Sequence, residues 1–372
     1  MAATAAPDAL TRAVLAHEDV ARFVHCAETR ARLEEYLDEL RTTQRYKFYR
    51  ALQHPLYPIL RKIDRITEHV ERARRAVAGG HVVYVSNHKS HLDYLIELLT
   101  LDKHGIRPPL IAAGINLFGG ALGLLHRHVT GAIPIRRGSK DPVYLATLKA
   151  YIVEILRRHD LLYYAEGGRS YTGELKAPKT GLLQAALQAD RTHLVLVPMA
   201  IAYDLVLEEK IITRDATRKH KRPFAQEVTE MIRHAVGYES RAFVTFGHPI
   251  ALVEYDPSAR RDLVALAHRV QHEVGLLHKV LPTSLVASAL RTSMTRSELA
   301  ARIDDLLALL TAQQANLSVT SGRQAVDEGV PMLVSRGILV AERQRIRVRD
   351  RVSLRYYART LQHLIPHRRV TH

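Results

Sequence analysis

The chain has 372 residues, of which 47% are hydrophobic, and its formal net charge at pH 7 is +16. The hydrophobic content excludes an intrinsically disordered protein, and the length allows one large domain with additions or two to three domains. The single cysteine excludes a disulfide framework and indicates a reducing compartment, whereas the positive charge favours anionic partners such as nucleic acid, lipid headgroups or phosphorylated metabolites.

Residues 1–76 are predicted to form an N-terminal helical region. Apolar residues recur at three- and four-residue spacings from about Ala9 to Ala76, and two prolines within Ala51–Leu60 divide the pattern into two parts. The first ten residues lack the basic start and apolar run of a secretory signal, so no such signal is expected. Gly79-Gly80 marks the boundary to the next region.

Residues 77–285 are predicted to form an α/β domain with a mostly parallel sheet flanked by helices. Short apolar runs typical of buried strands alternate here with longer segments of helical periodicity. The predicted strands are His81–Ser86, Leu110–Ala113, Gly131–Ile135, Leu161–Ala165, Leu194–Ile201 and Ala242–Phe246. The predicted helices are Leu92–Lys103, Val143–Arg158, Thr180–Gln188 and Arg260–Leu277.

Residues 286–372 are predicted to form a C-terminal, mainly helical region. Thr295 and Glu298 have the spacing of a capping box, which predicts a helix from there to about Gln313. A short mixed piece with a small hairpin follows, and a helix is predicted over about 353–365.

The strongest chemical signal follows the first predicted strand, in the run Asn87-His88-Lys89-Ser90-His91-Leu92-Asp93-Tyr94. A turn into a helix can bring His88 and Asp93 together, and a carboxylate that holds an imidazole prepares it to deprotonate an alcohol. Two other interpretations stay open: Ser90 and Asp93 cap the helix and His88 is incidental, or His88, His91 and Asp93 bind a metal. Convincing further ligands are lacking in the sequence, so no metal is expected.

Two later segments add positive charge and backbone donors. Gly131–Arg137 is a strand that ends in two arginines, and because adjacent strand residues face opposite sides, only one of Arg136 and Arg137 is expected to face a given site and grip a phosphate. In Glu166-Gly167-Gly168-Arg169-Ser170, two glycines after a strand let backbone N–H groups approach a ligand as an anion nest or oxyanion donors. Each segment also fits a plainer alternative, a solvated basic strand end and a tight turn with a surface ion pair.

Taken in order with Leu196-Val197-Pro198-Met199, these segments resemble the four sequence blocks of the glycerolipid acyltransferase superfamily. The likeness is greatest to the membrane-bound glycerol-3-phosphate acyltransferases of bacteria and mitochondria, strongly from about residue 80 to 290 and thinly to the end. The blocks depart from the family pattern at Lys89, Ile133-Pro134 and Tyr171. These departures bear on the acceptor more than on the chemistry.

The resemblance implies a role for each matching residue. His88 would be the general base and Asp93 its orienting partner, and Glu166 and Gly167 would take part in catalysis, with backbone N–H groups at Gly167 and Gly168 stabilising the oxyanion. The remaining residues of the second and third blocks would bind the acceptor phosphate: Arg136, Arg137, Arg169, Ser170 and Lys179. In the fourth block, Pro198 would mark the acyl-donor side. No cofactor is expected beyond the co-substrate, acyl-CoA or acyl carrier protein carrying the acyl group.

The sequence therefore predicts an O-acyltransferase that moves a fatty acyl group to the sn-1 hydroxyl of glycerol 3-phosphate and gives lysophosphatidate. Two related acceptors stay open, dihydroxyacetone phosphate and 1-acylglycerol 3-phosphate. A basic nucleic-acid-binding protein is the alternative from a different class, suggested by the charge and the arginine-rich C-terminal part. No nucleic acid is expected, because the recognised blocks are apolar strands with polar loops and not one continuous basic face.

The same properties predict where the protein works. The longest apolar run, Leu110–Leu125, is too short and too irregular to span a membrane, and it is expected to be buried or to touch a membrane surface. The surplus of positive charge and the fatty product favour docking on anionic lipid. Peripheral or monotopic attachment at the cytoplasmic face of the cell membrane is the resulting prediction.

Overall fold

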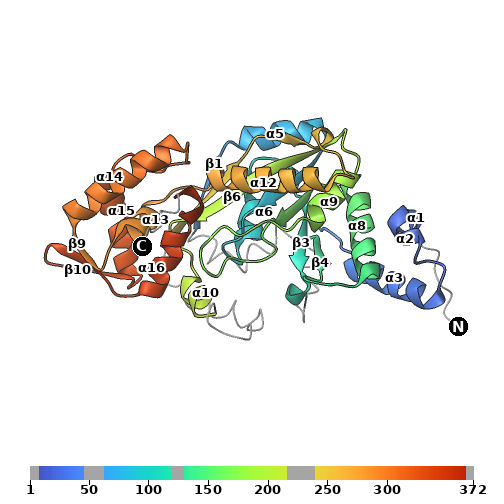
Figure 1. The fold of residues 1–372 in the computed structure, drawn as a ribbon, viewed down its shortest axis with the longest axis horizontal. Coiled ribbons are helices and arrows are strands. Elements are labelled where there is room, and N and C mark those ends of the chain that lie inside the picture. The colour runs from blue at the N-terminus through green and yellow to red at the C-terminus, as the bar shows by residue number, and fades with distance from the viewer. Residues whose placement is uncertain (1–7, 46–62, 119–129, 216–238, 366–372) are drawn as a thin grey trace.

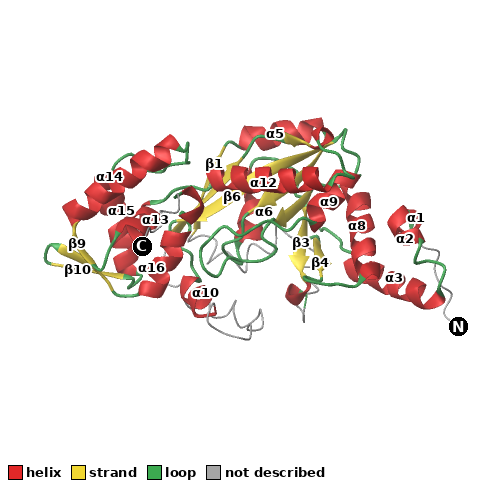
Figure 2. Cartoon of the chain, in the orientation of Figure 1, coloured by secondary structure: helices red, strands yellow, loops and turns green. Residues whose placement is uncertain are grey.

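The computed structural model describes residues 8–45, 63–118, 130–215 and 239–365 (Figure 1). Within these residues, a large mixed sheet carries helices on both faces, and a smaller helical region with its own three-stranded sheet follows, as Figure 2 shows. The predicted α/β class with a mostly parallel sheet and a mainly helical C-terminal region is confirmed. The exact domain boundaries, 1–76, 77–285 and 286–372, stay predictions.

The large sheet has the strand order β1-β7-β6-β2-β5-β3-β4, with β8 beside β6. Neighbouring strands run parallel except where β6 meets β7 and β8. The strands are β1 Ile63–Glu68, β2 His81–Ser86, β3 Leu110–Gly114, β4 Ala132–Ile135, β5 Leu161–Tyr164, β6 Leu194–Tyr203, β7 Ser240–Phe246 and β8 Ile250–Ala251. The antiparallel C-terminal sheet contains β9 Ser293–Thr295, β10 Leu339–Glu342 and β11 Arg345–Val348.

The helices divide into three groups along the chain. The four predicted in the α/β region are present as α6 Asp93–Lys103, α8 Pro142–Leu156, α9 Gly181–Gln188 and α12 Arg260–Leu277. Others described before the C-terminal region are α1 Ala9–Ala16, α2 Glu18–Ala21, α3 Ala27–Leu40, α5 Val70–Gly79, α10 Glu209–Asp215 and the 3₁₀ turns η1 Ile115–Leu117 and η2 Leu252–Glu254. The C-terminal region contains α13 Pro282–Ala289, α14 Arg296–Ala312, α15 Gly322–Ser335, α16 Arg351–Arg359 and the 3₁₀ turn η3 Gln362–Leu364.

Strand β2 lies in the middle of the large sheet and explains the continuous apolar runs of the sequence. Val82 and Tyr84 pack in one layer of the core with α5 and α6. Val83 and Val85 pack in the other layer with α8, α9 and α12. Because side chains alternate along a strand and helices cover both faces, both sets are buried. The strand therefore directs His88, two residues beyond its end, to the carboxyl edge of the sheet, where sites of α/β proteins gather.

The prediction for the N-terminal region was wrong in one part. Ile63–Glu68 is not helical but forms β1, which pairs in parallel with β7 at the edge of the large sheet. Only Ile63 of this strand is buried, as suits an edge strand that is only partly covered. The prolines of Ala51–Leu60, used to divide the helical pattern, lie outside the described residues.

In the C-terminal region, the predicted capping box and hairpin are confirmed, and one helix was missed. Thr295 Oγ1 accepts the Glu298 N–H at 3.2 Å, and Glu298 Oε2 accepts the Thr295 N–H at 2.8 Å. The piece read as mixed contains α15, whose glycines obscured it. A Cβ at Gly322 would lie 1.9 Å from the carbonyl oxygen of Ala300 in α14, so this glycine is required for close helix packing.

The segment Leu110–Leu125, predicted to be buried or to contact a membrane, is described only in part. Its first residues form the sheet strand β3, in which Leu110 and Ile111 are buried. Ile115 in η1 is exposed, and residues 119–125 lie outside the described residues. Among the helices that the structure describes, none combines the length and the apolar character needed to cross a membrane.

Buried polar contacts join the C-terminal region to the α/β region around the start of α10. Arg336, just after α15, forms a buried ion pair with Glu209 and donates to the carbonyl oxygens of Val206 and Leu207 at 3.2 and 3.1 Å. The Tyr357 hydroxyl in α16 accepts the Val206 N–H at 3.1 Å. Figure 1 shows α14, α15 and α16 together at one end of the molecule and α1 to α3 at the other.

Candidate active site

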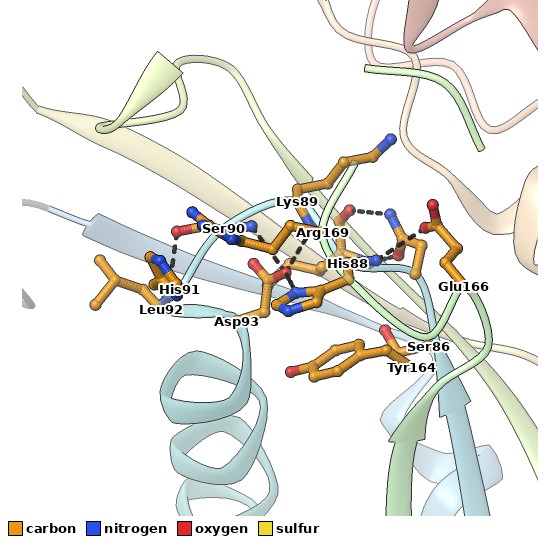
Figure 3. Close-up of polar contacts among 12 residues, drawn as sticks. Ser86, His88, Lys89, Ser90, His91, Leu92, Asp93, Tyr164, Glu166 and Arg169 are labelled. Carbon is orange, nitrogen blue, oxygen red and sulfur yellow. Dashed lines mark hydrogen bonds and ion pairs between the residues drawn. The ribbon is translucent and has the colours of Figure 1, made fainter. Parts of the chain in front are cut away.

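The turn between β2 and α6 brings His88 and Asp93 together, as the sequence predicted (Figure 3). His88 Nδ1 lies 2.8 Å from Asp93 Oδ2. The same carboxylate oxygen accepts the backbone N–H groups of Lys89 at 2.6 Å and Ser90 at 2.9 Å. Asp93 therefore satisfies the backbone of the turn and holds the imidazole at once, so the capping and the catalytic interpretations describe the same carboxylate. Its bond to Nδ1 fixes the ring orientation and leaves Nε2 as the other ring nitrogen.

Burial has the largest effect on the protonation of this pair. It raises the pKa of Asp93 to about 6, against hydrogen bonds that include one from the Tyr203 hydroxyl at 2.7 Å and lower that pKa. Burial also lowers the pKa of His88 well below its usual range, and the positive charge of Arg169 acts in the same direction. At neutral pH the imidazole is therefore neutral, which is the form that can accept a proton.

Two side chains beneath His88 were missed by the sequence analysis. Tyr164, the last residue of β5, stacks on the His88 ring with the ring centroids 4.0 Å apart and an angle of 10° between the planes. Its hydroxyl donates to Glu97 Oε2 at 2.8 Å, and the Ser86 hydroxyl donates to Glu97 Oε1 at 2.6 Å. Glu97 lies one helical turn after Asp93 and is fully buried. The spacing of these two carboxylates on an otherwise apolar helix was the signal that could have revealed it.

The loop after β5 covers the turn that carries His88. Glu166 Oε1 accepts the His88 N–H at 3.0 Å, and Glu166 Oε2 accepts the Lys176 N–H at 3.2 Å. The Ser170 N–H donates to the His88 carbonyl oxygen at 3.0 Å, and the Ser170 hydroxyl donates to the Glu174 carbonyl oxygen at 2.7 Å. Glu166 and Ser170 thus fix the backbone around His88. Ser170 is fully buried with its hydroxyl engaged, so this arrangement does not present it to an acceptor phosphate as predicted.

Gly167 turns this loop and does not offer its N–H to a ligand. Its φ of +68° lies in the left-handed region that glycine adopts at no steric cost. Its N–H donates to the Tyr164 carbonyl oxygen at 3.0 Å, which corrects the expectation that this group stabilises an oxyanion. A Cβ at Gly167 would lie 3.0 Å from Lys179 Cγ, so the glycine also allows the Lys179 side chain to lie against the turn.

The two arginines after β4 face opposite sides, as the strand geometry predicted. Arg136 Nε donates to Glu39 Oε1 at 2.8 Å, and the Arg136 guanidinium lies 4.8 Å from the centre of the Tyr36 ring. Arg137 instead lines the cavity beside His88. Arg137 therefore lines both cavities, whereas Arg136 ties β4 to α3 and lines only the larger cavity, and its phosphate contact stays a prediction.

Arg169 and Glu208 lie side by side on the other flank of the turn. Arg169 is buried, with Nη1 3.9 Å from Glu208 Oε1 and its guanidinium 5.3 Å from the centre of the Tyr171 ring. Glu208 accepts the Ser90 hydroxyl at 2.8 Å and the His91 N–H at 2.7 Å. Glu208, which no local motif indicated, therefore holds the outer side of the turn as Asp93 holds its inner side.

Lys89 connects the site to the C-terminal region. Its Nζ donates to the Gly173 carbonyl oxygen at 2.7 Å, and burial lowers its pKa. Gly173 has a φ of +90°, and a Cβ there would lie 2.0 Å from the Tyr356 carbonyl oxygen in α16. The loop that covers His88 is thus pressed closely against the C-terminal region, an approach that only glycine permits.

Two adjoining cavities open beside His88, with volumes of about 30 Å³ and about 260 Å³. They share the lining residues Ala112, Ala113, Arg137 and Tyr164. The smaller one includes His88 and His91, and the larger one adds Lys179 and an apolar wall of Ile135, Leu148 and Leu182.

Pro198 lies inside the sheet and away from these cavities. It sits in β6 opposite Val85 of β2, and its carbonyl oxygen accepts the Gly247 N–H at 2.7 Å. In a strand, the N–H and C=O of one residue point to the same side, so the missing N–H of the proline faces the bend between β7 and β8, where no ladder bond is lost. Neither cavity beside His88 is lined by Pro198, so its predicted place on the acyl-donor side is not supported by this geometry.

Comparison with known proteins gives two matching family models. The Acyltransferase model matches residues 65–202, which include His88, Asp93 and the loop after β5. The model of the glycerol-3-phosphate acyltransferase C-terminal region matches residues 229–368. Glu208 lies between the two matched stretches.

Similar whole proteins carry the name glycerol-3-phosphate acyltransferase. The one from Shewanella pealeana is 30% identical over 362 residues, covering 87% of this chain and 44% of that protein. The one from Actinobacillus succinogenes is 35% identical over 253 residues, covering 64% and 30%. The chain therefore spans less than half the length of these relatives.

A solved structure, the 1-acyl-sn-glycerophosphate (LPA) acyltransferase from Thermotoga maritima, aligns with a TM-score of 0.38 and 16% identity over 68% of this chain and 83% of that one. The two family models in sequence order, together with the relatives, decide the assignment. The chain belongs to the glycerol-3-phosphate acyltransferase family of the acyltransferase superfamily.

Proposed function

We propose that this protein transfers a fatty acyl group from acyl-CoA or acyl carrier protein to the sn-1 hydroxyl of glycerol 3-phosphate and forms lysophosphatidate. One observation carries the proposal: a neutral, buried imidazole is held at Nδ1 by Asp93 and lines a cavity that also contains the Arg137 guanidinium. A base beside a cation is the pairing needed to activate an alcohol that bears a phosphate. The names of the family relatives support the same acceptor.

The reaction follows from the two ring nitrogens of His88. Nε2 takes the proton of the acceptor hydroxyl while the oxygen attacks the thioester carbonyl carbon. Asp93 stabilises the imidazolium that results, because its carboxylate faces the protonated Nδ1. The new C–O bond replaces the C–S bond, and the departing thiolate takes the proton from Nε2. A base placed in this way contributes about 10²–10⁴-fold to the rate.

The acceptor phosphate is proposed to lie among the cations that converge near His88. Arg137 and Lys179 line the cavities, and Arg169 is buried on the opposite flank of the turn. Arg137 is exposed to solvent and lines both cavities, so its planar guanidinium is open to bidentate binding of a phosphate. Arg136 and Ser170 contribute by holding β4 and the loop in place.

The acyl chain is proposed to occupy the larger cavity, on the apolar wall formed by Ile135, Leu148 and Leu182. With the acyl chain on this wall, the thioester carbonyl would lie between the wall and His88. Burying each methylene group of the chain stabilises the complex by about 0.8 kcal/mol, which is enough to orient a long acyl donor.

The decisive test compares wild type with His88→Ala, using palmitoyl-CoA and, in separate reactions, three acceptors: glycerol 3-phosphate, dihydroxyacetone phosphate and 1-acylglycerol 3-phosphate. Acylated product is followed by mass spectrometry. We expect wild type alone to form lysophosphatidate from glycerol 3-phosphate. Product from another acceptor only would overturn the acceptor and keep the chemistry. Full activity in His88→Ala, with unchanged folding by circular dichroism, would overturn the mechanism.

We also propose that the protein works attached to the cytoplasmic face of an anionic membrane, peripherally or monotopically. The formal net charge of +16 supports attraction to such a surface. The test is co-sedimentation with vesicles of pure phosphatidylcholine and with vesicles containing 30% phosphatidylglycerol. We expect binding to the anionic vesicles that weakens as salt rises, because exposed charges are screened. Equal recovery from the supernatant in both cases would exclude this attachment.

A further inference from the structure

The His88 ring is held on two sides by different groups. Asp93 holds its edge through Nδ1 at 2.8 Å, and Tyr164 supports its face at a centroid distance of 4.0 Å with nearly parallel planes. The carboxylate alone leaves the imidazole free to rock about the line that joins the two groups. A ring stacked on one face removes that freedom, because the Tyr164 ring occupies the space into which the imidazole would tilt.

Tyr164 is itself fixed from below by a buried carboxyl group. Its hydroxyl donates to Glu97 Oε2 at 2.8 Å, and the other oxygen of Glu97 accepts the Ser86 hydroxyl at 2.6 Å. Ser86 ends β2, two residues before His88, and Glu97 lies in α6 one turn after Asp93. The chain of contacts thus leaves the His88 turn, passes through Glu97 and returns to the His88 ring through Tyr164, which Figure 3 shows below that ring.

We propose, on the basis of the function proposed above, that Glu97 and Tyr164 are positioning residues for His88: Glu97 anchors the Tyr164 hydroxyl, and the Tyr164 ring sets the orientation of the imidazole. Glu97 acts through Tyr164, and Tyr164, which lines both cavities, acts on the reaction through its contact with the His88 ring. Their effect is to hold Nε2 in the direction of the acceptor hydroxyl, and therefore to raise the rate of the chemical step without changing the affinity for the acceptor.

The protonation of Glu97 agrees with this role. Burial raises its pKa well above the usual range, and repulsion from Asp93 acts in the same direction. Glu97 therefore stays neutral while Asp93 is ionised at neutral pH, and its protonated oxygen donates in one of its contacts with the Tyr164 and Ser86 hydroxyls. The two carboxyl groups of α6 divide the work: Asp93 supplies the negative charge that faces the imidazole, and Glu97 supplies hydrogen bonds without a competing charge.

A buried tyrosine hydroxyl does not need such a partner in this fold. Tyr84, on the neighbouring strand β2, is fully buried, and its hydroxyl has no hydrogen-bond partner among the residues that the structure describes. Tyr84→Phe is therefore a matched control for Tyr164→Phe. Both substitutions remove one hydroxyl from a central strand, and only one of them breaks a contact that leads to His88.

The test measures kcat and KM for Tyr164→Phe, Tyr164→Leu, Glu97→Gln and Tyr84→Phe. We expect Tyr164→Phe to lower kcat about tenfold with little change in KM, since a misplacement of 1 Å costs roughly 10²-fold. Glu97→Gln keeps both hydroxyl contacts through its amide and is expected to stay within about threefold of wild type, while Tyr84→Phe is expected to match wild type. Thermal unfolding of each variant verifies the fold.

A second readout separates positioning from general stability. Tyr164→Leu uncovers one face of His88, so burial lowers its pKa less and the acidic limb of the rate profile moves to higher pH. The charged groups that also face His88 are unchanged in this variant: Asp93 of α6, Lys89 of the turn, Arg137 after β4, and Arg169 and Lys176 of the loop after β5. Tyr84→Phe leaves the limb in place.

A third readout does not depend on activity. Modification of His88 by diethyl pyrocarbonate, followed by peptide mass spectrometry, is expected to be faster in both Tyr164 variants than in wild type and in Tyr84→Phe. The inference would be overturned if Tyr164→Phe and Tyr164→Leu both kept the kcat, the acidic limb and the labelling rate of wild type. If wild type transfers no acyl group, the proposed function fails, and the labelling rates alone decide whether Tyr164 holds the ring.

Discussion

The His88 turn and the contact between the α/β and C-terminal regions bury charge in different ways. In the turn, Asp93 accepts hydrogen bonds from backbone N–H groups and a tyrosine hydroxyl, and Glu166 accepts from backbone N–H groups beside the charge of Lys89. At the contact, Glu209 pairs directly with Arg336, and both side chains are buried. Because its donors are neutral, the Asp93 carboxylate keeps its charge available to stabilise a protonated His88. In the ion pair, the charges of Glu209 and Arg336 compensate each other and serve only to hold the two regions together. The comparison separates residues that prepare chemistry from residues that fix regions together.

The largest expected effect tests the chemical side of this comparison. Asp93→Asn keeps the size of the side chain but removes its charge, so the imidazolium loses its stabilisation and Nδ1 its fixed tautomer. We expect kcat to fall about 10²–10⁴-fold while the protein stays folded. Steady-state kinetics and thermal unfolding of the purified variant give the two numbers. If Asp93→Asn lowered the thermal stability but left the kcat of the folded protein unchanged, Asp93 would have a structural role and not a chemical one.

The structural side is tested by Arg336→Met, which leaves Glu209 buried without a counter-charge. We expect the free energy of unfolding to fall by about 3–5 kcal/mol in urea titrations. The double variant Arg336→Met with Glu209→Met removes both charges and is expected to recover most of that loss. Equal stability of the single and double variants would show that the pair does not bear on folding.

The two neighbouring arginines sharpen the comparison within one strand end. Arg137→Ala is expected to raise KM for the phosphorylated acceptor about 10–100-fold, corresponding to the roughly 1.5–3 kcal/mol of a charged hydrogen bond. Arg136→Ala removes a partly exposed pair with Glu39 and is expected to lower stability by no more than about 1 kcal/mol, with KM unchanged. The opposite result for the two variants would exchange their roles.

The smallest expected effect is a shift of pH dependence. Asp93 and His88 take up protons as a coupled pair, and burial raises the pKa of Asp93 to about 6, so kcat/KM is expected to fall as the pH drops through about 6. Tyr203→Phe removes a hydrogen bond that lowers the Asp93 pKa, which moves this limb to higher pH by up to about one unit. A limb that stays in place would mean that Tyr203 does not act on the pair.

The sequence predicted the parts of the fold that rest on local patterns. Buried strands at the sheet centre are apolar on both faces, and therefore the runs at β2, β3, β5 and β6 were recognisable without tertiary information. The strand β1 was not, because its Asp64 and Arg65 interrupt the apolar pattern and its partner β7 lies far along the chain. Helix α15 was missed because Gly322, Gly329 and Pro331 usually break helices, whereas Gly322 and Gly329 here allow close packing.

The candidate site was predictable to the same extent. The spacing of His88 and Asp93 pointed to their contact, and strand geometry indicated that Arg136 and Arg137 would face apart. Which arginine faces the cavity depends on Glu39 of α3, far away in sequence. Glu208 could not be found from local sequence either, because its partners Ser90 and Arg169 meet it only once the chain has folded.

The pairing of β1 with β7 has a consequence for the way the chain is made. The Thr245 hydroxyl on β7 donates to Glu68 on β1 at 2.8 Å, across 177 positions of sequence. During synthesis, β6 therefore leaves the ribosome well before β7, the strand that pairs with its free edge. β1 also pairs with β7, so it cannot join the sheet until β7 has been made. Until then the nascent sheet carries an open edge that can join another chain. A fragment that stops before residue 239 keeps this edge permanently and is expected to aggregate in cells.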